Sequence, residues 1–97
     1  MDAEKYKLRL YIAGKTQKSN RAIENLKKYC EGDSKNQYTV EIIDLLEHPQ
    51  LAEGEQIIAV PTLIKKLPAP IRVLVGDLSD KNKLLVGLNL VADDSAR

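Results

Sequence analysis

The sequence has no phenylalanine and no tryptophan, and its 97 residues include one cysteine and one histidine. The hydrophobic core must therefore be filled by Leu, Ile, Val and the four tyrosines. A single cysteine excludes an internal disulfide, which is typical of a reduced, cytoplasmic protein. Neither Cys30 nor His48 has a second ligand nearby that would complete a metal site, so we expect no metal and no cofactor.

An excess of charge is also missing, because 15 basic residues are balanced by 14 acidic ones. Without a basic excess the chain lacks the electrostatic attraction that nucleic-acid binding needs, and we interpret Lys65 and Lys66 as solvated surface. No apolar run approaches the ~18 residues needed to cross a membrane, and the charged start of the chain does not follow the pattern of a signal peptide. We therefore expect a cytoplasmic protein with no nucleic-acid and no membrane partner.

The composition that remains is typical of a small globular protein, with 43% hydrophobic and 30% charged residues. A chain of this length has room for one hydrophobic core. No internal repeat or low-complexity segment divides it, so residues 1–97 are expected to form one domain.

Two segments of the first half alternate in polarity, which predicts β-strands. Residues 6–12 place apolar side chains on one face and basic ones on the other, and Ala13-Gly14 ends this strand. Residues 38–45 form the second strand, with Tyr38, Val40 and Ile42 on one face. A helix between them would make a right-handed βαβ unit with parallel strands.

The helix is predicted by apolar residues at helical spacing, namely Ala22, Ile23, Leu26, Tyr29 and Cys30. Thr16 or Ser19 is placed to cap its N-terminus. Gly32 is expected to end it in a left-handed turn.

The second half gives weaker signals. Pro49 suits the first turn of a helix that continues through Leu51, Ala52 and Glu55. Residues 57–67 predict a strand interrupted at Pro61, whereas residues 67–70 contain two prolines and fit neither a regular helix nor a central strand. Residues 71–75 are interpreted as a short buried strand.

The last segment fits a helix and a strand about equally well. Asp77 or Ser79 could cap a helix with the apolar face Leu84, Leu85, Leu88 and Val91. Leu84, Val86, Leu88 and Leu90 also form a period-2 set, and Gly87 costs a helix about 1 kcal/mol against alanine. Residues 56–60 show a similar conflict, so the two halves of the chain differ in how firmly their local sequence specifies structure.

The residues point to binding rather than catalysis. Thiol–disulfide exchange needs a reactive thiolate, and the sequence has no Cys-x-x-Cys pair. Cys30 continues the apolar face of the predicted helix, so we interpret it as a small core residue. Nothing supports a catalytic carboxylate pair, and we expect no enzyme activity.

Several short blocks occur in a specific order and spacing: Leu10-Tyr11-Ile12-Ala13-Gly14, Val40-Glu41-Ile42-Ile43-Asp44, Pro49-Gln50-Leu51-Ala52-Glu53, Val60-Pro61-Thr62-Leu63, Leu67-Pro68-Ala69-Pro70-Ile71-Arg72 and Gly76-Asp77-Leu78-Ser79. This combination resembles the KaiB family of clock proteins and their bacterial homologues, from about Tyr6 to Leu90. The resemblance implies a thioredoxin-like α/β fold of order βαβαββα, with Pro61 in its cis-proline loop. It also implies an alternative, ground-state fold of order βαββααβ that shares the first half.

The resemblance further implies a regulatory protein without catalytic activity. In that picture the thioredoxin-like monomer docks on the CI ring of a KaiC-type hexameric ATPase and modulates its phosphorylation and ATPase state. KaiA and a sensor histidine kinase are further partners of the family. The ground state self-associates as a dimer or tetramer, so the family is metamorphic.

By position, the resemblance assigns residues to two roles. A partner-binding surface would contain Tyr38, Thr39, Glu41, Pro49, Leu51, Ala52, Gln56, Arg21 and Arg72. The cis-proline loop and the balance between folds would involve Pro61, Pro68, Pro70, Gly87 and Asn89.

The sequence departs from the family pattern at some of these positions. Glu41 and Gln56 stand where clock proteins usually have lysine, and Asn89 replaces a usual aspartate. These departures favour a non-cyanobacterial homologue that acts with a KaiC-like ATPase in stress response. The alternative function is a redox-inactive thioredoxin-like adaptor in bacterial stress response without a circadian role.

Overall fold

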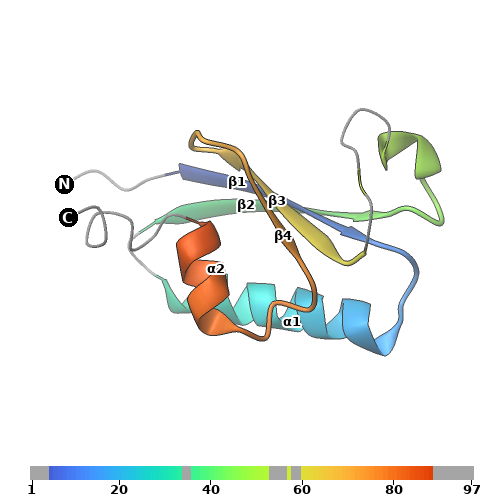
Figure 1. Cartoon of the computed structure of the whole chain (residues 1–97), viewed down its shortest axis with the longest axis horizontal. Coiled ribbons are helices and arrows are strands. Elements are labelled where there is room, and N and C mark those ends of the chain that lie inside the picture. The colour runs from blue at the N-terminus through green and yellow to red at the C-terminus, as the bar shows by residue number, and fades with distance from the viewer. Residues whose placement is uncertain (1–4, 34–35, 53–56, 58–59, 89–97) are drawn as a thin grey trace.

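The computed structural model describes residues 5–33, 36–52, 57 and 60–88 of the chain (Figure 1). Its elements follow the order strand, helix, strand, short helix, strand, strand, helix. They are β1 (Lys5–Ile12), α1 (Gln17–Gly32), β2 (Gln37–Asp44), the 3₁₀ helix η1 (Pro49–Ala52), β3 (Thr62–Leu67), β4 (Arg72–Val75) and α2 (Lys81–Gly87). This is the thioredoxin-like order predicted above, with η1 at the position of the second helix, and not the alternative βαββααβ order.

The four strands form one sheet in the order β2-β1-β3-β4. β1 and β2 are parallel, as a βαβ unit requires, while β3 pairs antiparallel with both β1 and β4. The helices α1 and α2 lie on one face of this sheet, and η1 lies toward the other (Figure 1). Strands β2 and β4 are therefore the two edges.

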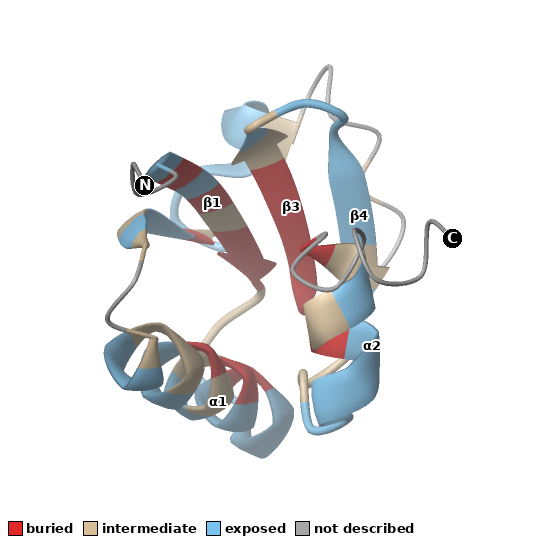
Figure 2. Ribbon diagram, turned by 90° about the vertical axis from the view of Figure 1, so that its left-hand side faces the viewer, coloured by how far each residue is buried: buried red, intermediate tan, exposed pale blue. Residues whose placement is uncertain are grey.

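The alternation predicted for residues 6–12 is confirmed in β1. Its even-numbered side chains from Tyr6 to Ile12 are buried against the helices, together with Ala22 and Leu26 of α1 (Figure 2). Thr16 caps α1, because its Oγ1 accepts a hydrogen bond of 3.0 Å from the amide of Ser19. Gly32 is the last residue of α1, but it does not adopt the predicted left-handed conformation. The next residue, Asp33, is extended, and the amide of Asp33 donates to the carbonyl of Cys30.

The predicted helix from Pro49 is a single 3₁₀ turn within the described residues. The amide of Leu51 donates to the carbonyl of His48 over 3.0 Å, the i to i+3 bond of a 3₁₀ helix. Glu55 and Gln56 lie outside the described residues. The strand predicted for residues 57–67 begins only at Thr62, directly after the cis peptide bond of Pro61.

The prediction of a buried strand at residues 71–75 was correct about the strand and wrong about its burial. β4 has one neighbouring strand, and only one of its faces is covered by α2 (Figure 2). Val73 and Val75 are consequently 57% and 59% exposed. An apolar sequence therefore forms an edge strand here, where a buried one was expected.

Lys65 also differs from its prediction as solvated surface, because only 1% of it is exposed. Strand register places it beside Leu8, in the row next to Leu63 and Leu10 on the helix-covered face. The central position of β3 thus buries a lysine that was expected on the solvated surface.

Helix α2 resolves the ambiguity of residues 84–88 in favour of the helix, with Leu84 and Leu88 buried. Its cap is Asp80, whose Oδ1 accepts from the amide of Lys83 over 3.2 Å, and not Asp77 or Ser79 as predicted. The Asp77 side chain instead accepts from the amide of Ser79, which forms a turn before the helix. Val91 and Asn89 lie outside the described residues.

Candidate partner-binding surfaces

The residues predicted for partner binding fall into a main group and scattered positions. Thr39 and Glu41 lie on β2, on the face of the sheet opposite the helices, where register aligns Glu41 with Arg9. Pro49, Leu51 and Ala52 form η1, which lies toward the same face. The structure therefore brings the β2 edge and η1 to one side of the molecule.

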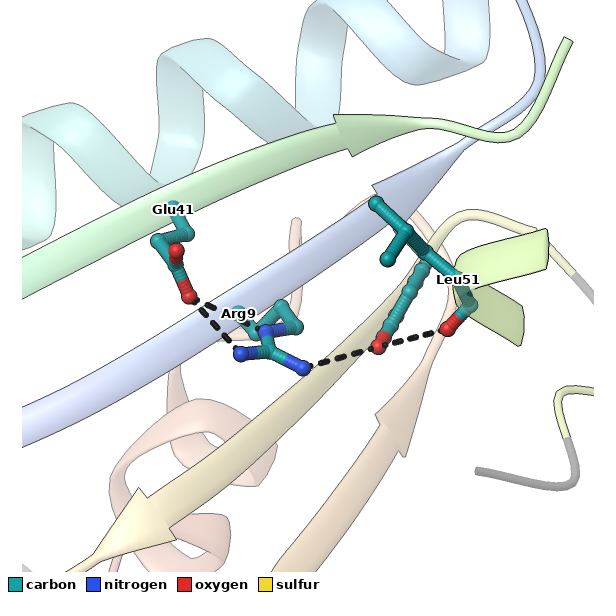
Figure 3. A network of polar contacts seen from close by, with 4 residues as sticks. Arg9, Glu41 and Leu51 are labelled. Atoms are coloured by element: carbon teal, nitrogen blue, oxygen red, sulfur yellow. Dashed lines mark hydrogen bonds and ion pairs between the residues drawn. The ribbon is translucent and has the colours of Figure 1, made fainter. Parts of the chain in front are cut away.

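A chain of polar contacts connects these two segments (Figure 3). The guanidinium of Arg9 contacts Glu41 Oε1 through both Nε and Nη2, each at 3.0 Å. Its Nη1 donates to the hydroxyl oxygen of Tyr11 over 3.3 Å, and that hydroxyl donates to the carbonyl of Leu51 over 3.4 Å. The hydrogen bond with Tyr11 is the main cause that raises the pKa of Arg9 above its ordinary value.

Tyr11 is fully buried and supports η1 from below. It packs with Ile43 and Ile64 in a second apolar cluster, to which Leu45 and Ile57 add contacts. The hydroxyl of a buried tyrosine needs a partner, and here it finds the Leu51 carbonyl. The position of η1 over the sheet thus depends on a residue of β1 that lies 40 positions earlier in the sequence.

Asp44 connects the two loops beside this surface. Its Oδ1 accepts from the amides of Gly14 and Leu46, both at 2.9 Å. Gly14 has a φ of +78°, which a side chain would disfavour, and a Cβ there would lie 2.8 Å from Leu46 Cδ1. The loop after β1 and the loop after β2 are therefore held together at the end of the sheet where η1 begins.

Tyr38 does not join the group, although it lies on the same strand. Its ring lies on the helix-covered face, stacked on Tyr6 with centroids 5.1 Å apart and edge-to-face with Tyr29 at 6.1 Å. Its hydroxyl donates to Asp33 Oδ2 over 2.5 Å. Burial, and then this hydrogen bond, raise the pKa of Tyr38, so the residue acts as a structural support of the βαβ unit.

Two further predicted positions lie apart from this surface. Arg21 is on α1, mostly exposed, with Nη1 3.9 Å from Asp77 Oδ2. Arg72 begins β4 at the opposite edge of the sheet from Glu41. Gln56 lies outside the described residues, so the group that the structure brings together contains Thr39, Glu41, Pro49, Leu51 and Ala52.

Of the residues assigned to the fold balance, those that the structure describes lie around β3, β4 and α2. The peptide bonds before Pro61, Pro68 and Pro70 are all cis, and Pro61 directly precedes β3 as expected of a cis-proline loop. Gly87 ends α2 against Leu74 of β4. A Cβ at Gly87 would lie 2.7 Å from Leu74 Cδ1 and 2.8 Å from its Cγ.

Sequence reasoning missed the roles of Arg9 and Tyr11. Arg9 was counted only as a polar residue of an alternating strand, and Tyr11 was quoted only within a block. One signal was available: Leu10, Tyr11 and Ile12 are consecutive apolar residues at the end of β1, which indicates burial on both faces. The partner of the Tyr11 hydroxyl had no such signal, because it is a backbone carbonyl of a distant segment.

Cys30 is half-buried against the main core, as its place on the helix face predicted. Burial is the main cause that raises the pKa of its thiol to about 11, with Asp33 and Glu31 adding to the effect. A thiol with a raised pKa is a poor nucleophile at neutral pH, because the thiolate is the reactive form.

This gives a direct prediction for alkylation. At pH 8 the folded protein should hold a share of Cys30 thiolate about a hundredfold lower than a thiol with the ordinary value, since the pKa lies about two units higher. Mass spectrometry should therefore show iodoacetamide labelling that is about a hundredfold slower in the folded protein than in urea. Equal rates in the two states would contradict the buried thiol.

Two further properties concern the described part of the chain. No group of three or more His, Cys, Asp or Glu residues there could hold a metal ion. None of the helices there is long and apolar enough to cross a membrane.

Comparison with known proteins gives consistent matches over nearly the whole chain. The KaiB domain family matches residues 9–90. The circadian clock oscillator protein KaiB of Picosynechococcus is 49% identical over 89 residues, covering 92% of this chain and 86% of that protein. The circadian clock protein KaiB3 of Synechocystis is 48% identical over 93 residues, covering 96% and 91%.

Solved structures support the fold. The N-terminal domain of Synechococcus elongatus SasA superposes with a TM-score of 0.72 at 25% identity, covering 91% of this chain and 87% of that domain. A designed protein superposes with a TM-score of 0.69 at 23% identity, covering 93% and 78%, and shows the fold alone. With the domain match over residues 9–90, these findings show that the chain belongs to the KaiB family and has its thioredoxin-like fold.

Proposed function

We propose that this protein is a non-enzymatic regulator that binds the CI ring of a KaiC-type hexameric ATPase and modulates its phosphorylation and ATPase state. The observation that carries the proposal is the match to KaiB proteins at 48–49% identity over more than nine-tenths of the chain. These relatives are circadian clock proteins, and the proposal extends that role to this chain.

The proposed contact surface consists of η1 and the neighbouring β2 edge. Leu51 is 41% exposed, so an apolar side chain is available to a partner while its carbonyl is held by Tyr11. An apolar side chain on a backbone that is fixed in this way suits an interface, because little backbone conformational freedom is lost on binding.

The β2 edge offers a second mode of contact, for a partner such as KaiA or a sensor histidine kinase. An edge strand has main-chain groups without a neighbouring strand, and an extended segment of a partner can pair with them. The side chains of Val40 and Ile42 are partly exposed along this edge. Arg9 contacts Glu41 on this edge and also Tyr11, which in turn contacts Leu51 of η1. A partner bound at one of the two sites would therefore affect the position of the other.

We further propose that the thioredoxin-like form is the ring-binding state and that the second half of the chain exchanges with a self-associated ground state. The support is the period-2 pattern of residues 84–90, which competes with the helical pattern seen in α2. A second set of amide signals from residues 60–88 in NMR spectra, in slow exchange with the first, is the expected result.

The test of ring binding is size exclusion with light scattering on the purified protein, alone and with the KaiC homologue encoded in the same genome. We expect a nucleotide-dependent shift of this protein into the peak of the ring, with ATP and ADP giving different amounts. A ring that elutes alone under all nucleotide conditions would refute the proposal. The scattering mass of the free protein reports its self-association in the same experiment.

The second candidate function is a redox-inactive thioredoxin-like adaptor in stress response, without a circadian role. The structural likeness to the SasA N-terminal domain favours it, because that domain is one part of a larger protein. A partner screen that recovers a signalling protein and no ring ATPase would support the adaptor. Disulfide reductase activity lost on Cys30→Ser would contradict both functions.

A further inference from the structure

The turn between β4 and α2 is held against α1 by a hydrogen bond from a side chain (Figure 1). The amide group of Asn25, in the middle of α1, donates from Nδ2 to the backbone carbonyl of Asp77 over 2.8 Å. The two residues are 52 positions apart in the sequence. The bond therefore connects the half of the chain that local patterns specify firmly to the half that they specify weakly.

The same turn contains a residue in an unfavourable backbone conformation. Leu78 has a φ of +63°, in the left-handed region that a leucine rarely adopts. Such a conformation persists only where the surrounding contacts outweigh its cost. One of these contacts is the packing of the partly buried Leu78 side chain against the main core. Another is the bond from Asn25 to the residue directly before Leu78.

The carboxylate of Asp77 adds less to the attachment of this turn. It accepts from the amide of Ser79 over 3.1 Å, a bond that shapes the turn without reaching another element. Arg21 of α1 lies 3.9 Å from the same carboxylate, but its side chain is 59% exposed, and exposed ion pairs contribute little to stability. Among these polar contacts, the bond from Asn25 is therefore the one that holds the turn to α1.

We propose that Asn25 acts as a latch for residues 76–88. While its bond to Asp77 is made, the strained turn stays against α1 and α2 stays over the sheet. When the bond breaks, Leu78 can leave the left-handed region, and the turn and α2 separate from the sheet as one unit. α1 itself stays in place during this opening, because Ala22 and Leu26 pack in the core with β1.

The latch gives the proposed exchange between folds a physical starting point. α1 belongs to the half that both folds would share, whereas the turn and α2 belong to the half that would exchange. A bond between the two halves favours the form in which its partners are adjacent, which is the thioredoxin-like one. This regulatory meaning rests on the proposed function, whereas the latch itself is a property of the fold described above.

The first test is native-state hydrogen exchange of the full chain, followed by NMR. The amides of Leu84 and Leu88 donate to the carbonyls of Asp80 and Leu84, so they exchange when α2 opens. In Asn25→Ala we expect both amides to exchange about fivefold faster, the effect of losing one hydrogen bond. The matched control is Asn20→Ala, because Asn20 is exposed on the same helix and the substitution raises helix propensity equally.

The pattern of exchange separates a latch from a general loss of stability. If the α2 amides exchange at the same rate in Asn25→Ala and in the Asn20→Ala control, the latch is refuted, even where the β1 amides exchange faster. That pattern would show that α2 opens without breaking the bond. Faster exchange of the α2 amides in Asn25→Ala alone supports the latch, because the opening of α2 must then break the bond.

The strain at Leu78 is tested by a second pair of variants. Leu78→Ala and Leu78→Gly both remove the packed side chain, but glycine adopts a φ of +63° at little cost and alanine does not. The α2 amides should therefore exchange about fivefold more slowly in Leu78→Gly than in Leu78→Ala. Equal rates, or the reverse order, would contradict the strained turn on which the proposal depends.

NMR spectra of the same samples separate this inference from the proposed exchange of folds. Where a second set of signals is present, Asn25→Ala should raise its share relative to the first set about fivefold. An unchanged share would show that the bond does not select between folds, against the proposal. If neither the parent protein nor the variant shows a second set, the proposed exchange is wrong, and faster exchange of the α2 amides still supports the latch.

Discussion

Replacing Leu51 with serine should weaken binding to the ring ATPase by about tenfold or more, a loss of about 1.4 kcal/mol in binding free energy. Leu51 is 41% exposed in the free protein, so its contact area remains available for a partner. Serine removes the apolar side chain and keeps the backbone carbonyl that accepts the Tyr11 hydrogen bond. Fluorescence anisotropy of labelled protein titrated with the nucleotide-bound ring measures the dissociation constant.

The matched control for this variant is Val86→Ser. Val86 is 63% exposed on α2, which lies on the opposite face of the sheet from η1. This control should bind the ring within about twofold of the parent protein. Urea unfolding of both variants separates a lost contact from lost stability. Equal weakening by both variants would show that the ring does not use η1 specifically.

Replacing Gly87 with alanine should destabilise the thioredoxin-like fold by about 1–3 kcal/mol, although alanine is the better helix former. Helix propensity alone would add about 1 kcal/mol of stability. The added Cβ would lie 2.7 Å from Leu74 Cδ1 and 2.8 Å from its Cγ, and near its Cδ2, so α2 or Leu74 must move. Urea unfolding followed by circular dichroism measures the change in the free energy of unfolding.

Gly32 provides the control, because it ends α1 and a Cβ there would meet no atom within 4 Å. Gly32→Ala should therefore be neutral or stabilise by up to about 1 kcal/mol. The double variant Gly87→Ala with Leu74→Ala tests the mechanism: removing the Leu74 side chain should abolish most of the penalty of Gly87→Ala. A stabilising Gly87→Ala variant would show that backbone propensity outweighs packing at this helix.

These two predictions concern different parts of the structure, and the sequence anticipated them unequally. η1 was expected near Pro49, and Leu51 was assigned to the partner surface by resemblance. The close approach of α2 to β4 was not expected, because Gly87 was considered as an unfavourable residue in a helix and as part of the balance between folds, and not as a packing contact. Its reason lies in Leu74, which is 13 residues earlier and has no local signal.

The first half of the fold was predictable because its signals are local. Each of these signals involves residues that are close together in the sequence. They are the alternation along β1, the helical spacing along α1 and the capping threonine. They agree with one another, and parallel pairing of β1 and β2 follows from the connection through a helix. Thr16 was confirmed as the cap for the same reason, and Cys30 packs half-buried against the core on the predicted helix face.

The second half depended on contacts that the sequence does not display. β4 has the composition of a buried strand, and its exposure follows from its place at the sheet edge. Lys65 was interpreted as solvated surface because of its charge, yet the central position of β3 buries it. Asp80, and not Asp77, caps α2 because Asp77 is part of the turn after β4 and the helix begins only after that turn.

The sequence by itself determined the βαβ half, the absence of a Cys-x-x-Cys pair and the blocks that identify the family, because each is a property of neighbouring residues or of fixed spacing. Tertiary structure decided the helical state of residues 84–87, the exposed edge of β4 and the contact of Tyr11 with η1. The physical reason is that these features depend on contacts between segments that are distant in sequence. Local preferences there differ by about 1 kcal/mol, which packing readily overrides.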